Sequence, residues 1–349
     1  MILADLVRKL GYEESGNYLS EDRGDFDHIV DYGHLFRRAA KEPCRLKGVY
    51  TLRQSDTYTI PVVYVCDTAS ESDAREVHRL VWNQDTVPFL IVNSPERVRV
   101  YPGFCRQRES ARSREIRETE QAFAQADIHR IAETLGATAV DTGDTWRVWG
   151  SHVRPEYRVD WGLLDNLRKL DSWLQGPGGL GPEISHALIG KYVYLHYLRD
   201  RDILSHRKLE RWRIPHDLVF GRCATRDGLK AIQEKLDAWL NGEVFPIDFG
   251  QRGAPRDEHI GRVAATFQGD EPLGTDRWQL HLDFKAYDFS YIPVEVLSVI
   301  YEQFLHAPEK DKSESRGRSA GAYYTPIPVV NLMLSELEER HPLRKGMRV

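Results

Sequence analysis

The feature that most constrains the fold is a strand–helix–strand pattern in the first third of the chain. Residues 59–66 form an apolar, β-branched run that is typical of a buried strand. Residues 70–82 carry apolar side chains at helical spacing, and residues 88–92 read PFLIV, a second apolar strand. This alternation predicts a sheet covered by helices.

The surrounding segments extend this unit into an α/β domain over residues 1–150. Residues 48–53 predict another strand beside the 59–66 run, and residues 89–101 read as a hairpin. Three further segments have helical spacing, namely residues 3–10, 35–41 and 118–135. We therefore expect a small mixed sheet with flanking helices.

A change of periodicity marks a second, helical domain over residues 151–270. Leucines from Leu163 to Leu174 recur at intervals of four, three and four residues, which predicts an amphipathic helix. Residues 182–200 are apolar nearly all round in their middle, so this helix should be central. A third helix is expected at 229–240.

A third segment covers residues 271–349. A helix is expected at 294–305, where Pro293 suits the position just before the helical pattern. A polar linker, 307–320, follows, and residues 321–326 then read GAYYTP. An apolar helical pattern occupies residues 327–337.

Composition excludes several classes of protein. No run of about 18 apolar residues exists, which argues against a transmembrane helix, and the first residues do not form a signal peptide. The four cysteines are scattered without metal-binding spacing, so we expect reduced thiols, no metal site and a cytoplasmic location. The formal net charge of −5 argues weakly against a protein whose sole role is binding nucleic acid.

Two stretches are nevertheless rich in basic residues, at 97–117 and 199–213. Such stretches are either solvated surface or a face that contacts phosphates, and the sequence leaves both readings open. The candidate DNA-binding residues are Arg106, Arg108, Arg112, Arg114, Arg207, Lys208 and Arg211.

The order of two motifs carries a resemblance to a known family. Residues 300–305 read IYEQFL, and GAYYTP follows after the linker. This pair resembles the start of the catalytic domain in gamma-class adenine DNA methyltransferases, including Type IIG restriction–modification enzymes. Weaker similarities to such enzymes occur at residues 78–101, 187–192 and 241–246.

The resemblance implies an S-adenosylmethionine-dependent enzyme of a restriction–modification or phage-defence system. It assigns cofactor binding to Tyr323, Tyr324, Thr325 and Pro326. It also implies a Rossmann-like catalytic domain whose first helix begins at these residues. Thr325 suits an N-cap and Pro326 a first helical position, so the helix start could face a carboxylate. Double-stranded DNA is the expected partner, and no membrane is involved.

The chain departs from the family pattern in two places. Family members carry an Asp-Pro-x-x-Gly-Ser-Gly loop for the cofactor and an Asn-Pro-Pro-Tyr/Phe tetrapeptide for the flipped adenine, and neither occurs here. We therefore expect the N-terminal part of a larger enzyme, with no catalytic residue and no activity of its own. The C-terminal methyltransferase region, or other defence-system subunits, would be its protein partners.

Two alternatives stay open. The chain could be a DNA- or protein-binding module of a defence complex, which uses its basic segments. It could also contain a metal-dependent nuclease, because the small α/β domain is compatible with a restriction-nuclease core, with Asp56 and Asp67 as candidate ligands. Residues 1–150 lack the Asp/Glu-x-Lys triplet of such nucleases, and the central strand reads VYV at 63–65. A nuclease-like domain would thus have lost its chemistry.

Overall fold

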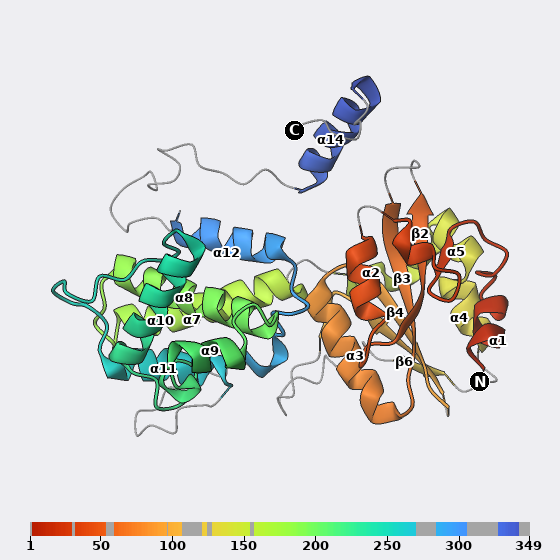
Figure 1. The fold of residues 1–349 in the computed structure, drawn as a ribbon. Helices are drawn as coiled ribbons and strands as arrows, with labels where there is room; N and C mark the ends of the chain where they lie inside the picture. The colour runs from red at the N-terminus through yellow and green to blue at the C-terminus, as the bar shows by residue number, and fades with distance from the viewer. Residues whose placement is uncertain are drawn as a thin grey trace.

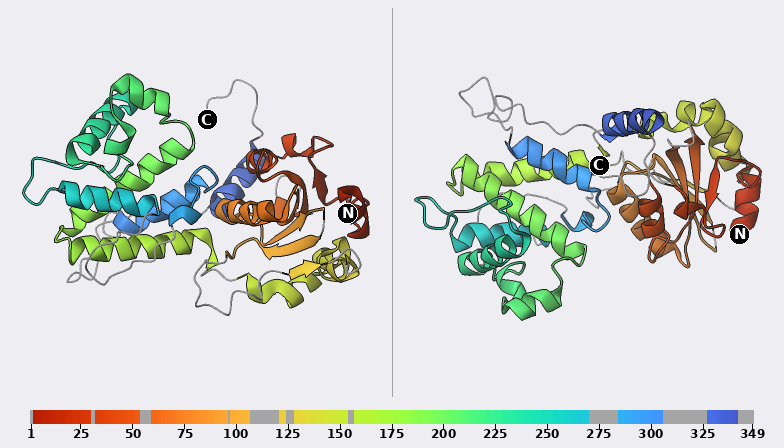
Figure 2. Two further views of the ribbon diagram at one scale, coloured as in Figure 1. Left: turned by 90° about the horizontal axis from the view of Figure 1, so that it is seen from below. Right: turned by 45° about the horizontal axis from the view of Figure 1, so that its top comes forward.

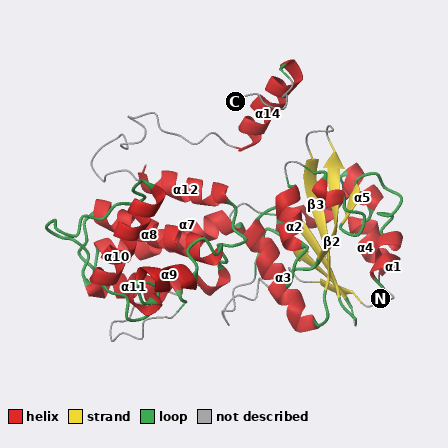
Figure 3. Ribbon diagram, in the orientation of Figure 1, coloured by secondary structure: helices red, strands yellow, loops and turns green. Residues whose placement is uncertain are grey.

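The structure, a computed structural model, describes most of the chain. The described residues are 2–29, 32–53, 59–95, 97–106, 121–123, 128–153, 157–269, 284–305 and 327–341. Within them the protein is mixed α/β, with a sheet and its helices up to residue 153 and a helical part after it (Figures 1 and 3). The expected mixed class is therefore confirmed.

The described strands form a single mixed sheet. They are β1 (Tyr18–Ser20), β2 (Leu46–Arg53), β3 (Thr59–Asp67), β4 (Phe89–Asn93), β5 (Val98–Pro102) and β6 (Gln121–Phe123). The strand order follows the sequence; β3 and β4 are parallel, and the other neighbouring pairs are antiparallel. The hairpin expected at 89–101 is confirmed, with Ile91 opposite Val100.

Helices cover both faces of this sheet (Figure 1). They are α1 (Leu3–Lys9), α2 (Gly33–Ala39), α3 (Glu71–Gln84), α4 (Ile128–Leu135), α5 (Ala137–Thr142) and α6 (Asp144–Trp149). Alternate residues of β3 point to opposite faces. Val63 and Val65 pack in a core with α1 and α4, whereas Tyr64 and Cys66 pack in a core with α2 and α3. A two-sided core of this kind requires the nearly continuous apolar run seen in β3.

The single helix expected at 118–135 is wrong. The structure has strand β6 at Gln121–Phe123, and α4 begins only at Ile128. β6 pairs with β5, where Ala122 lies opposite Arg99. The outer backbone groups of β5 gain hydrogen-bond partners in this way, a benefit that helical periodicity does not register.

The second part is a bundle of helices around one large core (Figure 2). Its helices are α7 (Val159–Gln175), α8 (Pro182–Asp200), α9 (His206–Trp212), α10 (Arg226–Leu240), α11 (Asp257–Phe267) and α12 (Val294–Leu305). Leu163, Leu167, Leu170 and Leu174 on α7 are all fully buried, as their spacing predicts. Helix α8 buries residues on all sides, which confirms its central place.

The core of the helical part continues beyond residue 270. Phe284 of the 3-10 turn Phe284–Ala286, Ile292 of the loop after it and Ile300 of helix α12 pack in this core with residues of α7 and α8. In the sequence these residues belong to the third segment, 271–349, where the start of a catalytic domain is expected. In the structure they pack with the second.

Helix α3 joins the two parts. Its Asn83 amide donates to the carbonyl of Ala286 at 2.7 Å and accepts from the backbone N–H of Asp288 at 2.9 Å. The Trp82 indole N–H donates to the carbonyl of Tyr157 at 2.9 Å. These hydrogen bonds are buried or partly buried, and through them α3 connects the sheet to the helical bundle directly.

The last described element is α14 (Ile327–Arg340) (Figure 1). It confirms the helix expected at 327–337. Among the described residues no helix combines the length and the apolar character that crossing a membrane requires.

Candidate nucleic-acid interface

Three of the predicted DNA-binding residues, Arg207, Lys208 and Arg211, lie together on helix α9. Ser205 caps the start of the helix, because its hydroxyl accepts from the backbone N–H of Lys208, and Arg213 follows the last helical residue in the left-handed conformation, with φ of 59°. Leu209 is its only buried residue. A short helix held by one apolar anchor presents its remaining side chains to the surface.

Lys208 lies against two tryptophans, and we call Lys208, Trp212 and Trp239 the tryptophan–lysine cluster. The Lys208 Nζ is 2.9 Å from the centre of the Trp239 ring and 5.6 Å from that of Trp212. The two rings are 5.8 Å apart and meet edge to face. Partial burial lowers the pKa of the Lys208 ammonium, and the nearby Arg211 charge adds to this effect. The cluster joins α9 to the end of α10.

The arginines of α9 have no acidic partner among the residues that the structure describes. Arg207, Arg211 and Arg213 are exposed and form no ion pair there. Glu210, the acidic residue within the helix, lies 3.3 Å from His206 instead. Cations that no ion pair neutralises create a positive potential suited to phosphate groups.

The other predicted arginines are not on this surface. Arg106 follows β5, and its guanidinium lies 5.8 Å from the Trp82 ring of α3, at the junction of the two parts. Arg108, Arg112 and Arg114 lie outside the described residues. The structure therefore brings together only the predictions from the 199–213 stretch.

The predicted cofactor-binding residues Tyr323, Tyr324, Thr325 and Pro326 also lie outside the described residues. The helix that follows them is described, and it has an unusual surface. Its exposed large apolar residues are Val329 (44%), Met333 (63%), Leu334 (56%) and Leu337 (51%). An apolar stripe this exposed normally lies against another part of a protein.

Two segments that carry the family resemblance meet in space. Gly190 of α8, from the 187–192 segment, lies against the ring of Phe245, from the 241–246 segment. Beside them Lys191 is almost fully buried, and desolvation lowers its pKa to about 8, against the opposing charges of Asp237 and Glu243. The contact explains why a glycine occupies the middle of a helix.

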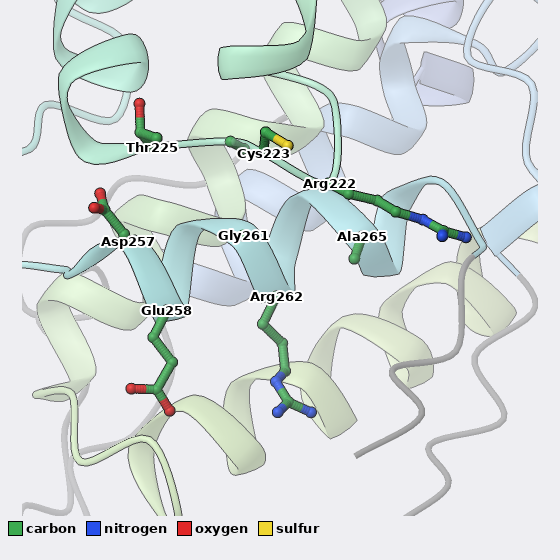
Figure 4. A pocket seen from close by; sticks show the side chains of 9 residues that line it. Arg222, Cys223, Thr225, Asp257, Glu258, Gly261, Arg262 and Ala265 are labelled. Atoms are coloured by element: carbon green, nitrogen blue, oxygen red, sulfur yellow. The ribbon is translucent and has the colours of Figure 1, made fainter.

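A surface depression of about 530 Å³ lies between α11 and the loop before α10 (Figure 4). Glu258 and Arg262 project from α11 at its edge, and Arg262 lies 4.3 Å from the Trp173 ring. The Asp257 carboxylate accepts from the backbone N–H of Arg226 at 2.6 Å, which ties α11 to the start of α10. Sequence reasoning gave no signal for this depression, because α11 itself was not predicted.

The described residues hold no group of three or more His, Cys, Asp or Glu side chains that could bind a metal ion. Asp67, a candidate ligand in the nuclease hypothesis, ends β3 and accepts from the Asn93 amide at 2.7 Å. Asp56 lies outside the described residues.

Comparisons of this chain with models of protein families, with curated proteins and with solved structures return no match.

Proposed function

We propose that this chain is the N-terminal region of an S-adenosylmethionine-dependent, adenine-specific DNA methyltransferase of a restriction–modification or phage-defence system. The observation that carries the proposal is the exposed apolar stripe of α14, directly after the GAYYTP segment. In a Rossmann-like catalytic domain, the helix that follows this segment packs against the sheet. The apolar stripe on α14 would provide the face with which such a helix packs against the sheet.

The cofactor site would be shared between this chain and the rest of the catalytic domain. Tyr323, Tyr324, Thr325 and Pro326 would hold S-adenosylmethionine at the start of α14, where backbone N–H groups and the helix dipole favour a carboxylate. The cofactor, when bound, supplies the methyl group. The glycine-rich loop and the adenine-binding tetrapeptide, which the chain lacks, would come from the remaining part of the enzyme.

The α/β part would serve a structural or binding role. Its mixed sheet, with helix α3 between parallel strands β3 and β4, is compatible with a restriction-nuclease core. On β3, however, Val63, Tyr64 and Val65 are fully buried, which leaves that strand without a carboxylate or lysine in the position of the catalytic triplet. This supports a degenerate domain over the alternative of an active, metal-dependent nuclease.

The cations of α9, which form no ion pair with any described residue, favour a second candidate function, a DNA-binding module within a defence complex. The two functions are compatible, because a methyltransferase must also hold its DNA. Replacing Arg207 and Arg211 together by glutamine should weaken binding to duplex DNA and reduce its salt dependence by about two charges. A matched control is Arg147→Gln, which removes an exposed arginine that already pairs with Asp144.

Cofactor binding tests the methyltransferase proposal. The chain should be combined with a neighbouring gene product or downstream segment that carries the glycine-rich loop, and titrated with S-adenosylmethionine. We expect binding that Tyr324→Ala and Thr325→Ala weaken by roughly 10-fold each, the loss of one or two good contacts. A combined protein that binds no cofactor would refute the proposal.

A further inference from the structure

We propose that the tryptophan–lysine cluster is a stacking site for unpaired bases, so that the α9 surface binds single-stranded nucleic acid in preference to duplex. This inference deepens the nucleic-acid contact proposed for α9 and rests on that contact. It does not depend on the assignment of the chain as a methyltransferase.

The exposure of Trp239 is the first observation. Trp82 and Trp149 are each only 5% exposed, whereas Trp239 is 42% exposed, and its neighbour Leu240 is 41% exposed. A large ring left in water costs free energy in proportion to its apolar area. A surface that keeps such a ring in place is suited to a ligand that covers it.

The ring is also held in a defined orientation. Trp212 packs partly into the helical core, and its edge-to-face contact with Trp239 joins the exposed ring to that support. Lys208 lies over Trp239 on the α9 side. A supported aromatic ring loses little conformational freedom when a flat ligand stacks on it.

Charge identifies the ligand. Arg207 and Arg211 extend from the same helix as Lys208 and Arg213 follows its end, all without acidic partners in the described part of the chain. An aromatic platform flanked by cations matches a chain of phosphates that carries flat bases. An acidic protein would match the charges, but it would leave the stacking face without a flat partner.

The pairing state of the ligand follows from the same geometry. In a duplex each base is stacked above and below, so its face is not available to a tryptophan on a protein surface. Bases of a single strand can be splayed onto an aromatic side chain. The structure thus favours unpaired DNA or RNA at this cluster.

The test measures fluorescence anisotropy of labelled oligothymidylate and oligouridylate of about 12 nucleotides, and of a DNA duplex of that length, with the full chain. Trp239→Ala should weaken binding of the single strands by about 5- to 50-fold, and binding of the duplex by less than about two-fold. Trp239→Phe, which keeps a ring, should stay within a few-fold of the parent protein. Unequal affinity for the two oligonucleotides tells whether DNA or RNA is preferred.

Two further variants keep the test decisive. Trp161 of α7 is 55% exposed and lies outside the cluster, so Trp161→Ala should leave every affinity unchanged. Trp239→Leu keeps a branched apolar side chain without the aromatic ring, and it takes the place of Trp239→Ala if the alanine variant does not fold. It should show the same selective loss of single-strand binding.

Three outcomes would overturn the inference. If the protein binds duplex more tightly than single strands, and substitution of Trp239 changes neither affinity, α9 contacts DNA without base stacking. If polyglutamate displaces the labelled oligonucleotide as well as unlabelled oligonucleotide does, and substitution of Trp239 does not change this competition, the partner of the surface is an acidic protein. Absence of binding to every nucleic acid would remove the α9 contact too, while leaving the cofactor titration as an independent test of the methyltransferase.

Discussion

Arg158 and Asp85 form an ion pair across the junction between the sheet and the helical bundle. The guanidinium lies 2.7 Å through Nη2 and 3.1 Å through Nε from Oδ2 of the carboxylate. The other oxygen, Oδ1, is buried and has no hydrogen-bond partner in the described structure. Burial outweighs the attraction of Arg158 and raises the pKa of Asp85 to about 7.

This pair predicts a dependence of stability on pH. The carboxyl has a pKa near 3.8 when unfolded and about 7 when folded, so the folded state binds the proton more tightly. The protonated Asp85 carboxyl therefore adds to the free energy of unfolding. This stabilisation is fully present below pH 3.8 and is lost as the pH rises through about 7. Between about pH 5 and about pH 8 the parent protein should lose about 1–3 kcal/mol that Asp85→Asn retains. Thermal unfolding of both proteins across this range provides the measurement, and parallel pH profiles would disprove the assignment.

Asn83 should be the residue whose loss most weakens the junction. Its side chain is fully buried and satisfies both the Ala286 carbonyl and the Asp288 N–H. Asn83→Ala removes the acceptor of the Asp288 N–H and leaves the Ala286 carbonyl only the Arg79 guanidinium as a side-chain donor, at 3.1 Å, and it should lower the free energy of unfolding by about 1–3 kcal/mol. Chemical denaturation measures the effect, and Gln251→Ala, at an exposed loop position, is the control. Equal stabilities for the two variants would mean that the junction is not held by this amide.

Gly190 offers a test of the contact between α8 and Phe245. An alanine usually stabilises a helix interior relative to glycine, but here its Cβ would lie 2.4 Å from the Phe245 ring. Displacement of the ring should make Gly190→Ala less stable by about 1–3 kcal/mol. Gly150→Ala is the matched control, because nothing lies within 4 Å of the added methyl group, and it should be neutral or slightly stabilising. A stabilising Gly190→Ala would show that the two segments do not pack together.

Charged substitutions in the apolar stripe of α14 should prevent assembly with the rest of the catalytic domain without destabilising the chain itself. Leu334→Glu combined with Leu337→Glu changes two exposed side chains, so the stability of the chain itself should change by less than about 1 kcal/mol. The same variant should no longer associate with the remainder of the catalytic domain, as measured by analytical ultracentrifugation. An exposed polar change on the same helix, Glu336→Gln, serves as the control. Unimpaired association of the double variant would exclude this face as the contact.

Local pattern predicted much of the fold. The four leucines of α7 predict a helix and the apolar run of β3 predicts a strand, because an element that is buried on one or both faces has apolar residues at regular spacing. Helix α9 was not predicted, since seven residues with a single buried leucine carry too little periodicity. Strand β6 was misread because its stability comes from pairing with β5, a partner about 20 residues away.

The candidate site was less visible in the sequence than the fold. The basic stretch at 199–213 indicated Arg207, Lys208 and Arg211, but nothing in it indicated Trp239, which reaches Lys208 from the end of another helix. The contact between Asn83 and Asp288 likewise joins positions 205 residues apart. Contacts of this kind depend on how helices pack, and a single sequence records no distance between them.

The central claim is tested most directly by methyl transfer to DNA. The chain alone, and the chain combined with a polypeptide that carries the glycine-rich loop and the Asn-Pro-Pro-Tyr/Phe tetrapeptide, should be incubated with labelled S-adenosylmethionine and unmodified duplex DNA. We expect no transfer by the chain alone and N6-methyladenine with the combination. Methylation by the chain alone, or none by a combination that is shown to assemble, would contradict the account.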